Sequence, residues 1–258
     1  MRLSCSTQCL PDEPLDQAFS AIREAGYEAV ELSWWQVESE AYADRCPANV
    51  LQDILGKYGF TLSGLTIREI AATSPEELRE ELSSLHDMMQ TAKALGLEAV
   101  NLLGGDRRHQ SLEMFAVALE ALLAIADEMQ LNIQLSNSYA SRVEQIEDLR
   151  YVMQAVDHPR LFLLNNTGQF HSAAVNPRYL LTEFANRLAL AHITDQVGKR
   201  AVPIGRGEMN VAAIVEHLAK IGYDGWLVVD QEFADYTEAV NILTANRLAL
   251  ESILNALQ

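Results

Sequence analysis

The sequence predicts an α/β protein folded as a closed (β/α)8 barrel, also called a TIM barrel. Short apolar runs alternate with amphipathic helical segments at intervals of about thirty residues along a chain of 258 residues. Such alternation indicates a parallel sheet, and apolar runs without strict period-two patterning are typical of strands buried on both faces. A third observation is a repeated pattern in which glycine ends a helix and an apolar strand follows a short turn. It occurs at Gly26–Leu32, Gly59–Leu65, Gly96–Leu102 and Gly222–Asp230.

The strands are expected where short, mainly apolar runs occur. In chain order these runs are Leu3–Ser6, Ala29–Leu32, Leu62–Leu65, Ala99–Leu103, Asn132–Leu135, Leu161–Leu164, Leu188–Ile193 and Trp226–Val229. An open, doubly wound sheet is the alternative. That fold usually has a glycine-rich phosphate loop after its first strand, whereas Ser6–Cys9 contains no glycine. Because no linker or low-complexity segment interrupts the pattern, residues 1–258 are expected to form one domain.

The helices between these strands are predicted by apolar spacing and by capping residues. Leu15, Ala18, Phe19, Ile22 and Ala25 share one helical face before the first glycine stop. A second helix is expected from Ser74 onward, because a capping box stands there: Ser74 is the cap, Pro75 lies in the first turn and Glu77 is the third helical residue. The later helical segments are Leu112–Met129, Ile146–Val156, Val211–Ile221 after an Asn210 cap, and about Tyr236–Leu257.

The composition disfavours nucleic-acid and membrane partners. The chain is 49% hydrophobic and has a formal net charge of −17, and such an acidic surface repels phosphate backbones and anionic lipids. No segment reaches the roughly twenty continuous apolar residues of a membrane helix, and the N-terminal residues do not resemble a signal peptide. Cys5, Cys9 and Cys46 form no CxxC pair and leave an odd count. Reduced thiols and a cytoplasmic location are therefore expected.

Polar residues gather where the predicted strands end. In a (β/α)8 barrel, the active site is built at the C-terminal ends of the strands. The residues expected there are Ser6, Thr7, Glu31, Trp34, Trp35, Thr66, Arg68, Asp106, Ser136, Asn137, Asn165, Asn166, Gln169, His192, Asp195, Asp230 and Glu232. Amides, hydroxyls and carboxylates, together with aromatic faces that can stack on C–H groups, suit a small polyol.

Several segments resemble the xylose-isomerase-like barrels of the sugar phosphate isomerase/epimerase superfamily. They are Gly26–Leu32, Asn165–Gln169, His192–Asp195, Val202–Glu208 and Gly222–Asp230. The resemblance implies a barrel that acts on a small sugar or sugar derivative, without selecting one substrate. It also implies one divalent metal, often manganese. The metal's ligands in the family are a Glu on the fifth strand, an Asp on the sixth, a His on the seventh and a Glu on the eighth.

The chain departs from this ligand set at three of its four positions. Ser136 replaces the first Glu, Asn166 replaces the Asp and Asp230 replaces the last Glu, while His192 is retained. The formal ligand charge therefore falls from three negatives to one, and a neutral amide or hydroxyl offsets the dehydration of a divalent ion less well than a carboxylate. We expect no metal ligand set of the family kind and no tightly bound cofactor. Weak divalent metal binding through His192 and Asp230 remains open.

The retained residues predict an isomerase- or epimerase-like enzyme with a degenerate metal site. Ser136 is no base at neutral pH, so a two-carboxylate epimerisation is disfavoured. A one-base reaction is expected instead, with Asp230 or Glu31 as the catalytic base and His192 as an electrostatic helper. Substrate-binding roles are expected for Asn166, Gln169, Ser136, Asn137, Arg206 and Trp34. The sequence does not decide which carbohydrate is bound or whether the protein is a homo-oligomer.

Two other functions have been weighed against this one. A non-catalytic sugar or polyol binder of the same superfamily is favoured by the loss of three of the four ligand types. A multi-zinc DNA-repair nuclease is disfavoured, because the chain lacks the rich His, Asp and Glu cluster of such a site and because its net charge repels DNA.

Overall fold

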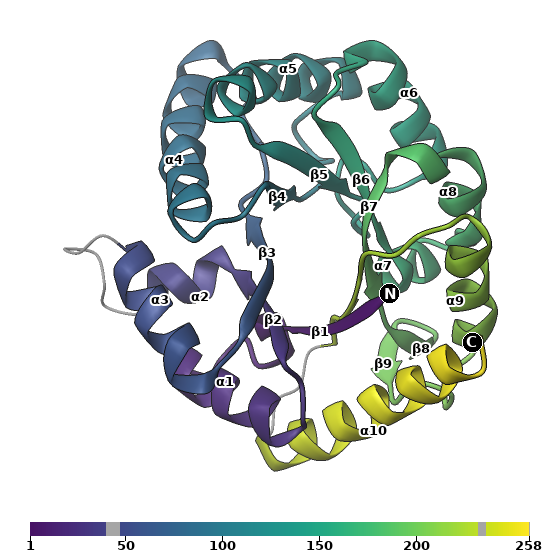
Figure 1. The fold of residues 1–258 in the computed structure, drawn as a ribbon. Coiled ribbons are helices and arrows are strands. Elements are labelled where there is room, and N and C mark those ends of the chain that lie inside the picture. The colour runs from purple at the N-terminus through teal and green to yellow at the C-terminus, as the bar shows by residue number, and fades with distance from the viewer. Residues whose placement is uncertain (40–46, 232–235, 258) are drawn as a thin grey trace.

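Eight parallel strands close into a barrel in the computed structural model, which describes residues 1–39, 47–231 and 236–257 (Figure 1). The order around the barrel is β1-β10-β7-β6-β5-β4-β3-β2. The strands are β1 (Arg2–Ser6), β2 (Ala29–Ser33), β3 (Thr61–Ile67), β4 (Ala99–Leu102), β5 (Asn132–Ser136), β6 (Leu161–Asn166), β7 (Leu188–Ile193) and β10 (Trp226–Val229). The predicted (β/α)8 barrel is therefore confirmed.

Helices surround the barrel and connect successive strands (Figure 1). They are α1 (Leu15–Glu24), α2 (Trp34–Ser39), α3 (Pro47–Tyr58), α4 (Pro75–Ala94), α5 (Leu112–Met129), α6 (Ile146–Val156), α7 (Thr167–Ser172), α8 (Arg178–Glu183), α9 (Val211–Lys220) and α10 (Tyr236–Asn255), with single 3-10 turns at Thr7–Cys9 and Ala185–Arg187. Ser74 caps α4 and Asn210 caps α9, as predicted. No helix in the described ranges combines the length and apolarity needed to span a bilayer.

The glycine pattern of the sequence has a backbone cause. Gly26, Gly59, Gly96 and Gly222 adopt φ values of 87°, 67°, 81° and 77°. This left-handed conformation ends a helix at little cost for glycine, which has no Cβ atom. Each of these residues therefore turns the chain from a helix into the strand that follows.

The barrel interior below the C-terminal ends of the strands is filled by a small apolar layer. Leu164, Leu190 and Val228 form a buried cluster of their own on β6, β7 and β10. Each residue lies two positions before one of the predicted site residues, Asn166, His192 and Asp230. Because side chains two apart on a strand share a face, this layer forms the floor on which the polar site rests. The side chains of Asn166, His192 and Asp230 therefore face the barrel interior, as the side chains of the cluster do.

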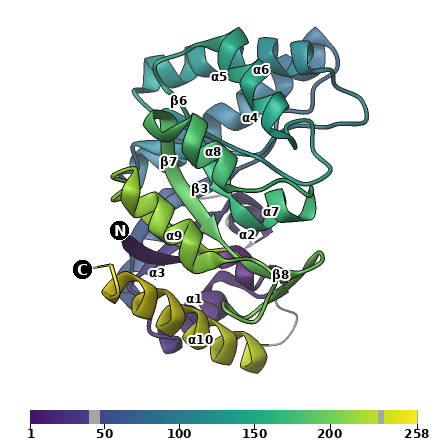
Figure 2. The ribbon, with the colours of Figure 1, turned by 90° about the vertical axis from the view of Figure 1, so that its right-hand side faces the viewer.

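A two-stranded hairpin was not predicted from the sequence. Strands β8 (Asp195–Val197) and β9 (Arg200–Val202) pair in antiparallel fashion between β7 and α9. Figure 2 shows the hairpin at the end of the barrel opposite to the two chain termini. It therefore stands at the end of the barrel where the strands have their C-terminal ends. The predicted strand-end residue Glu232 and the third cysteine, Cys46, lie outside the described residues.

Candidate active site

A cavity of about 560 Å³ opens at the C-terminal ends of the strands. The predicted site residues that line it are Glu31, Ser136, Asn137, Asn166, Gln169, His192 and Asp230. A larger opening of about 770 Å³ lies at the other end, around Arg2, Trp226 and Arg247. Barrels of this type perform their chemistry at the C-terminal end, so we assign the candidate site to the smaller cavity.

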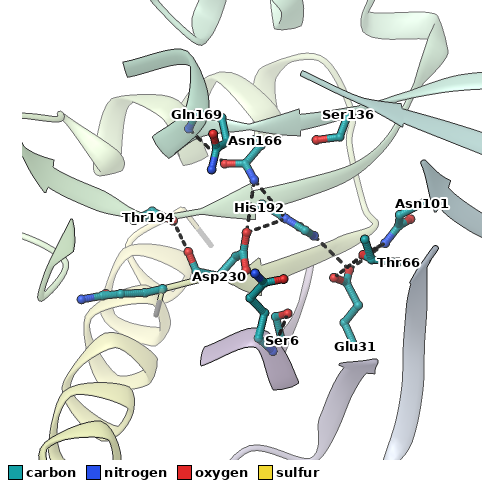
Figure 3. A network of polar contacts seen from close by, with 12 residues as sticks. Ser6, Glu31, Thr66, Asn101, Ser136, Asn166, Gln169, His192, Thr194 and Asp230 are labelled. Atoms are coloured by element: carbon teal, nitrogen blue, oxygen red, sulfur yellow. Dashed lines mark hydrogen bonds and ion pairs between the residues drawn. The ribbon is translucent and has the colours of Figure 1, made fainter. Parts of the chain in front are cut away.

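The centre of the site is a histidine held between two carboxylates (Figure 3). The His192 Nε2 atom lies 2.9 Å from Oε2 of Glu31, and Nδ1 lies 3.1 Å from Oδ2 of Asp230. The three residues come from β7, β2 and the exit of β10, and the side chains of His192 and Glu31 are only 7% and 1% exposed. Barrel closure thus joins residues that are distant in the sequence into one ion triad.

Neighbouring strands complete the hydrogen bonding of Glu31. The Thr66 hydroxyl on β3 donates to Oε1 at 3.1 Å, and the Asn101 amide on β4 donates to Oε2 at 2.9 Å. Gly64 makes room for this arrangement, because a Cβ atom there would lie 3.2 Å from the Asn101 amide and 3.4 Å from a Glu31 oxygen. A buried carboxylate with this many donors is fixed in one orientation.

The backbone on both sides of Asp230 is also fixed. The Thr194 hydroxyl donates to the Asp230 carbonyl oxygen at 2.5 Å. The buried Cys9 thiol donates to the Val229 carbonyl oxygen at 3.5 Å and accepts from the Gln231 N–H at 3.4 Å. The carboxylate is therefore presented to the cavity from a constrained segment, although the strand itself ends at Val229.

The triad changes the protonation of its members. Burial acts to lower the pKa of His192, but the charges of Glu31 and Asp230 and their hydrogen bonds outweigh it and raise that pKa to about 10. Burial acts to raise the pKa of Asp230. The positive charge of His192 and hydrogen bonds from His192, Asn166 and Ser6 outweigh it and lower that pKa. At neutral pH the site therefore holds an imidazolium beside an ionised Asp230.

Asn166 joins the triad to the helix that follows β6. Its Oδ1 atom accepts from the Gln169 N–H at 3.2 Å and caps α7, while its Nδ2 group donates to Asp230 Oδ2 at 3.1 Å. Nδ2 also lies 3.3 Å from Nδ1 of His192, but both nitrogens are donors when the imidazole is charged. The Asn137 side chain pairs with the Asn166 backbone at 3.1 and 3.0 Å. These amides therefore form one ordered wall.

The donor set does not fit the divalent metal that the fold family implies. Both imidazole nitrogens of His192 are engaged by carboxylates, and the Ser136 hydroxyl donates to the Asn137 carbonyl oxygen at 2.9 Å. Asn166 directs its NH2 group, which cannot ligate a cation, at Asp230. In the described ranges, no group of three or more His, Cys, Asp or Glu side chains is arranged to hold a metal. We therefore derive no chemistry through a metal.

Two expected substrate-binding residues lie away from the cavity. Trp34 is 7% exposed and packed in the core, and the next residue, Trp35, lines the cavity instead. Successive helical residues point about 100° apart, so one position decides which ring faces the site. Arg206 is exposed and does not line the cavity. Its loop is held by Asp195, whose carboxylate accepts the N–H groups of Gly205 and Gly207 at 2.8 and 2.9 Å.

Several lining residues were missed by the sequence reasoning. Asn101 lies in the middle of an apolar strand. Tyr139 and Lys199 lie in connecting segments whose path the sequence does not specify, and Arg200 is the first residue of the short strand β9. Asn101 could have been found by its polarity alone, since a polar side chain inside a buried parallel strand needs a partner. The hairpin residues carried no comparable signal.

A sequence profile described as "Xylose isomerase-like TIM barrel" matches residues 19–252. The chain belongs to this family. Its resemblance to these barrels, inferred above from local motifs, is therefore confirmed, and family members bind small sugar substrates.

Individual relatives agree with this assignment. The chain is 26% identical over 256 residues to the rhizopine catabolism protein MocC of Rhizobium meliloti, covering 86% of this chain and 75% of MocC. It is 23% identical over 137 residues to an inosose dehydratase of Clostridium tetani, covering 45% of this chain and 46% of that protein. The match thus spans about half the length of the dehydratase. A solved structure described as IOLI protein with a binding zinc atom shares the fold, with a TM-score of 0.83, 17% identity and 99% coverage of each chain.

Proposed function

We propose that this protein is an isomerase- or epimerase-like enzyme that transfers a proton on a small sugar or sugar derivative, without a tightly held metal. Asp230 is the base in this proposal. The observation that carries it is the Glu31–His192–Asp230 triad, which keeps one carboxylate ionised at the edge of a polar cavity.

Exposure decides which carboxylate can act. The Asp230 side chain is 18% exposed and lines the cavity, whereas the Glu31 side chain is 1% exposed and is covered by its own hydrogen-bond partners. A general base must come within hydrogen-bond reach of the proton that it removes. Asp230 meets this condition at the cavity wall, and Glu31 instead serves to hold His192 in its charged form.

The chemistry is removal of a proton from a carbon next to a carbonyl group. Asp230 accepts the proton, and the electron pair of the C–H bond moves toward the carbonyl oxygen to give an enediolate. The fixed positive charge of His192 and the side-chain amide of Gln169 stabilise negative charge that develops nearby. Return of this proton from Asp230 to the neighbouring carbon, with transfer of the hydroxyl proton between the two enediolate oxygens, completes an isomerisation. An epimerisation at the original carbon requires instead that solvent water deliver a proton to the opposite face while Asp230 keeps the proton it removed.

The substrate class is supported by the lining and by the relatives. Amides, hydroxyls and the Trp35 ring supply hydrogen bonds and an apolar face of the kind that a polyol needs. Among the relatives, one is named for the dehydration of inosose and another for rhizopine catabolism. The finer assignment, a site of this family that works without its usual metal ligands, is our proposal.

Solvent exchange tests this proposal. The protein is incubated with ketoses, inosose and hydroxypyruvate in D2O with EDTA present, and deuterium incorporation is followed by proton NMR. We expect incorporation next to the carbonyl of one of these compounds, and a loss of roughly 10²-fold or more in Asp230→Asn. Asp224→Asn, an exposed carboxylate at the other end of β10, is the matched control and retains the wild-type rate.

A non-catalytic sugar or polyol binder is the second candidate. It is favoured by the hydroxyl of Ser136, which stands where a second base would be needed, and by the engagement of both His192 nitrogens. Binding of a polyol in the cavity without any exchange in the whole panel would select this function over catalysis.

A further inference from the structure

We propose that the ligand of this cavity carries an anionic group, a carboxylate or a phosphate, which Lys199 and Arg200 bind at the rim. The proposal rests on the proposed function, because it names the class of sugar derivative that the same site takes. Lys199 lies in the turn of the β8–β9 hairpin and Arg200 is the first residue of β9, and both line the cavity.

The hairpin brings these cations to the catalytic end by a defined turn. Gly198 adopts a φ of 59°, which lets the chain reverse between β8 and β9, and its N–H donates to Glu208 at 3.1 Å. The Lys199 ammonium donates to the Tyr139 hydroxyl and lies 4.1 Å from the centre of that ring. Lys199 thereby connects the hairpin to the loop after β5 across the cavity rim.

Lys199 and Arg200 are the only lysine and arginine side chains among the described residues that line this cavity. The chain has 19 basic and 36 acidic residues, and arginines such as Arg150 and Arg160 pair with carboxylates. Lys199 and Arg200 pair with no carboxylate among the described residues, although acidic side chains are in excess. An arginine that is already bonded to a carboxylate has few hydrogen-bond donors left for a ligand. Lys199 and Arg200 line the cavity without a carboxylate partner, so their charges are available to an anionic ligand.

The charges also orient the ligand. The cavity floor holds Glu31, His192 and Asp230, whose charges sum to −1 when the imidazole is protonated, and the rim adds two positive charges. An anionic group is repelled by the floor and attracted to the rim. Binding at Lys199 and Arg200 therefore leaves the polyol end of the ligand to reach Asp230. The net charge of −17 repels anions at long range, so recognition depends on this local contact.

The test compares three ligands with one carbon skeleton. Sorbitol is neutral, gluconate carries a carboxylate and sorbitol 6-phosphate carries a phosphate. Their affinities are measured by calorimetry at low ionic strength and again at about 0.5 M NaCl, where exposed charges are screened. The variant is Lys199→Gln/Arg200→Gln. Its matched control is Arg79→Gln/Arg108→Gln, which removes the same charge from two exposed arginines outside the cavity.

We expect one or both anionic ligands to bind wild type and control at least about tenfold more tightly than sorbitol at low salt. In the hairpin variant this advantage disappears while the sorbitol affinity is retained, which also shows that the variant is folded. The tighter of the two anions identifies the group that the rim prefers. High salt reduces the advantage in the wild type.

Three results would overturn the proposal: no advantage of either anion over sorbitol, an advantage that persists in the hairpin variant, or no binding of any of the three ligands. Failure here is separable from failure of the proposed function. Deuterium exchange on a neutral ketose, together with no advantage of either anion over sorbitol, sustains the enzyme and refutes the anion site. Anion preference without exchange sustains the anion site and refutes the chemistry.

Discussion

His192 supplies, inside the barrel, a positive charge that two carboxylates require. Glu31 and Asp230 both contact its ring, and without a cation between them two buried negative charges would repel each other. Both contacts use ring nitrogens, so the imidazolium is held in place and cannot serve as a mobile acid. We infer that His192 sets the charge of the site and that Asp230 performs the proton transfer.

The stability of the protein should depend on the charge of His192. Its pKa is raised from the ordinary value of 6.5 to about 10 in the folded state, so folding favours the protonated form. This contribution is fully present below pH 6.5 and is lost as the pH rises through about 10. Urea unfolding across this range should show a decrease in the free energy of unfolding that is absent in His192→Gln. His109→Gln, an exposed imidazole, should retain the decrease.

Two buried asparagines should respond in opposite ways to the same substitution. Asn165 is 0% exposed and neither polar atom of its side chain has a partner among the described residues, whereas Asn137 is 0% exposed and doubly hydrogen-bonded. Leucine has a similar shape without the polar atoms, so Asn165→Leu should raise the free energy of unfolding by about 1 kcal/mol or more. Asn137→Leu should lower it by a similar amount. Destabilisation by both variants would show that Asn165 has a partner, such as a buried water.

At the scale of elements, one carboxylate organises the segment after the hairpin. Asp195 is fully buried and accepts N–H groups from Gly205, Gly207 and Met209 at 2.8, 2.9 and 3.1 Å. A Cβ atom on Gly207 would lie 2.1 Å from Asp195 Oδ1, so the close approach requires glycine. The turn thus follows from a single side chain and one small residue.

Removal of this carboxylate should loosen the segment while leaving the barrel strands intact. In Asp195→Ala these three donors and the Gln196 N–H lose their acceptor, at a cost of about 3 kcal/mol in the free energy of unfolding. Hydrogen exchange should speed up at Gly205, Gly207 and Met209 and remain slow in β6 and β10. Uniform exchange rates in wild type and variant would show that the carboxylate does not hold the loop.

Elements with strong local signals were predictable, and those that depend on tertiary contacts were not. Helix α5 was expected at its observed bounds, because its apolar spacing is a local signal; the structure adds that Ser111 caps it. Strand β6 was expected to end at Leu164 but continues to Asn166, where its neighbours supply the pairing. The hairpin strands have three residues each, too few for a pattern.

The site was predictable where strand ends determine it. The side chains of Asp230, His192 and Asn166 lie in contact, as expected, because barrel topology alone places the ends of their strands together. The contact of Glu31 with His192 was not predictable, since it depends on side-chain reach across the interior and on the space left by Gly64. Trp35 lines the cavity in place of Trp34, and this too was not predictable, because it depends on which of two successive helical residues faces the site.

At the scale of the whole molecule, barrel closure creates the site. Strand β1 pairs with β10 from Arg2↔Trp226 to Cys5↔Val229, which joins the first and last strands of the chain and closes the barrel. Residues 161 positions apart, Glu31 and His192, then share a hydrogen bond. Loss of this seam would separate the carboxylates of the triad, so the integrity of the site and of the fold are linked.

Closure also predicts that residues 1–258 unfold as one unit. Trp35 lies at the end of the barrel with the candidate site, and Trp226 lies at the start of β10, at the opposite end. Single-tryptophan variants retaining one or the other should give coincident urea transitions by fluorescence, and both should coincide with the loss of helical circular dichroism. Separate midpoints for the two ends would reveal independent folding units and contradict a single domain.

The protonation of His192 at pH 8 is the most direct measurement of the charge arrangement on which the proposed chemistry depends. Nitrogen-15 NMR of the ring, in protein treated with EDTA, distinguishes a protonated from an unprotonated nitrogen at each position. A pKa of about 10 predicts that both Nδ1 and Nε2 carry protons at pH 8 and that His192→Gln removes these signals. A neutral ring with one bare nitrogen at pH 8 would contradict an imidazolium between Glu31 and Asp230.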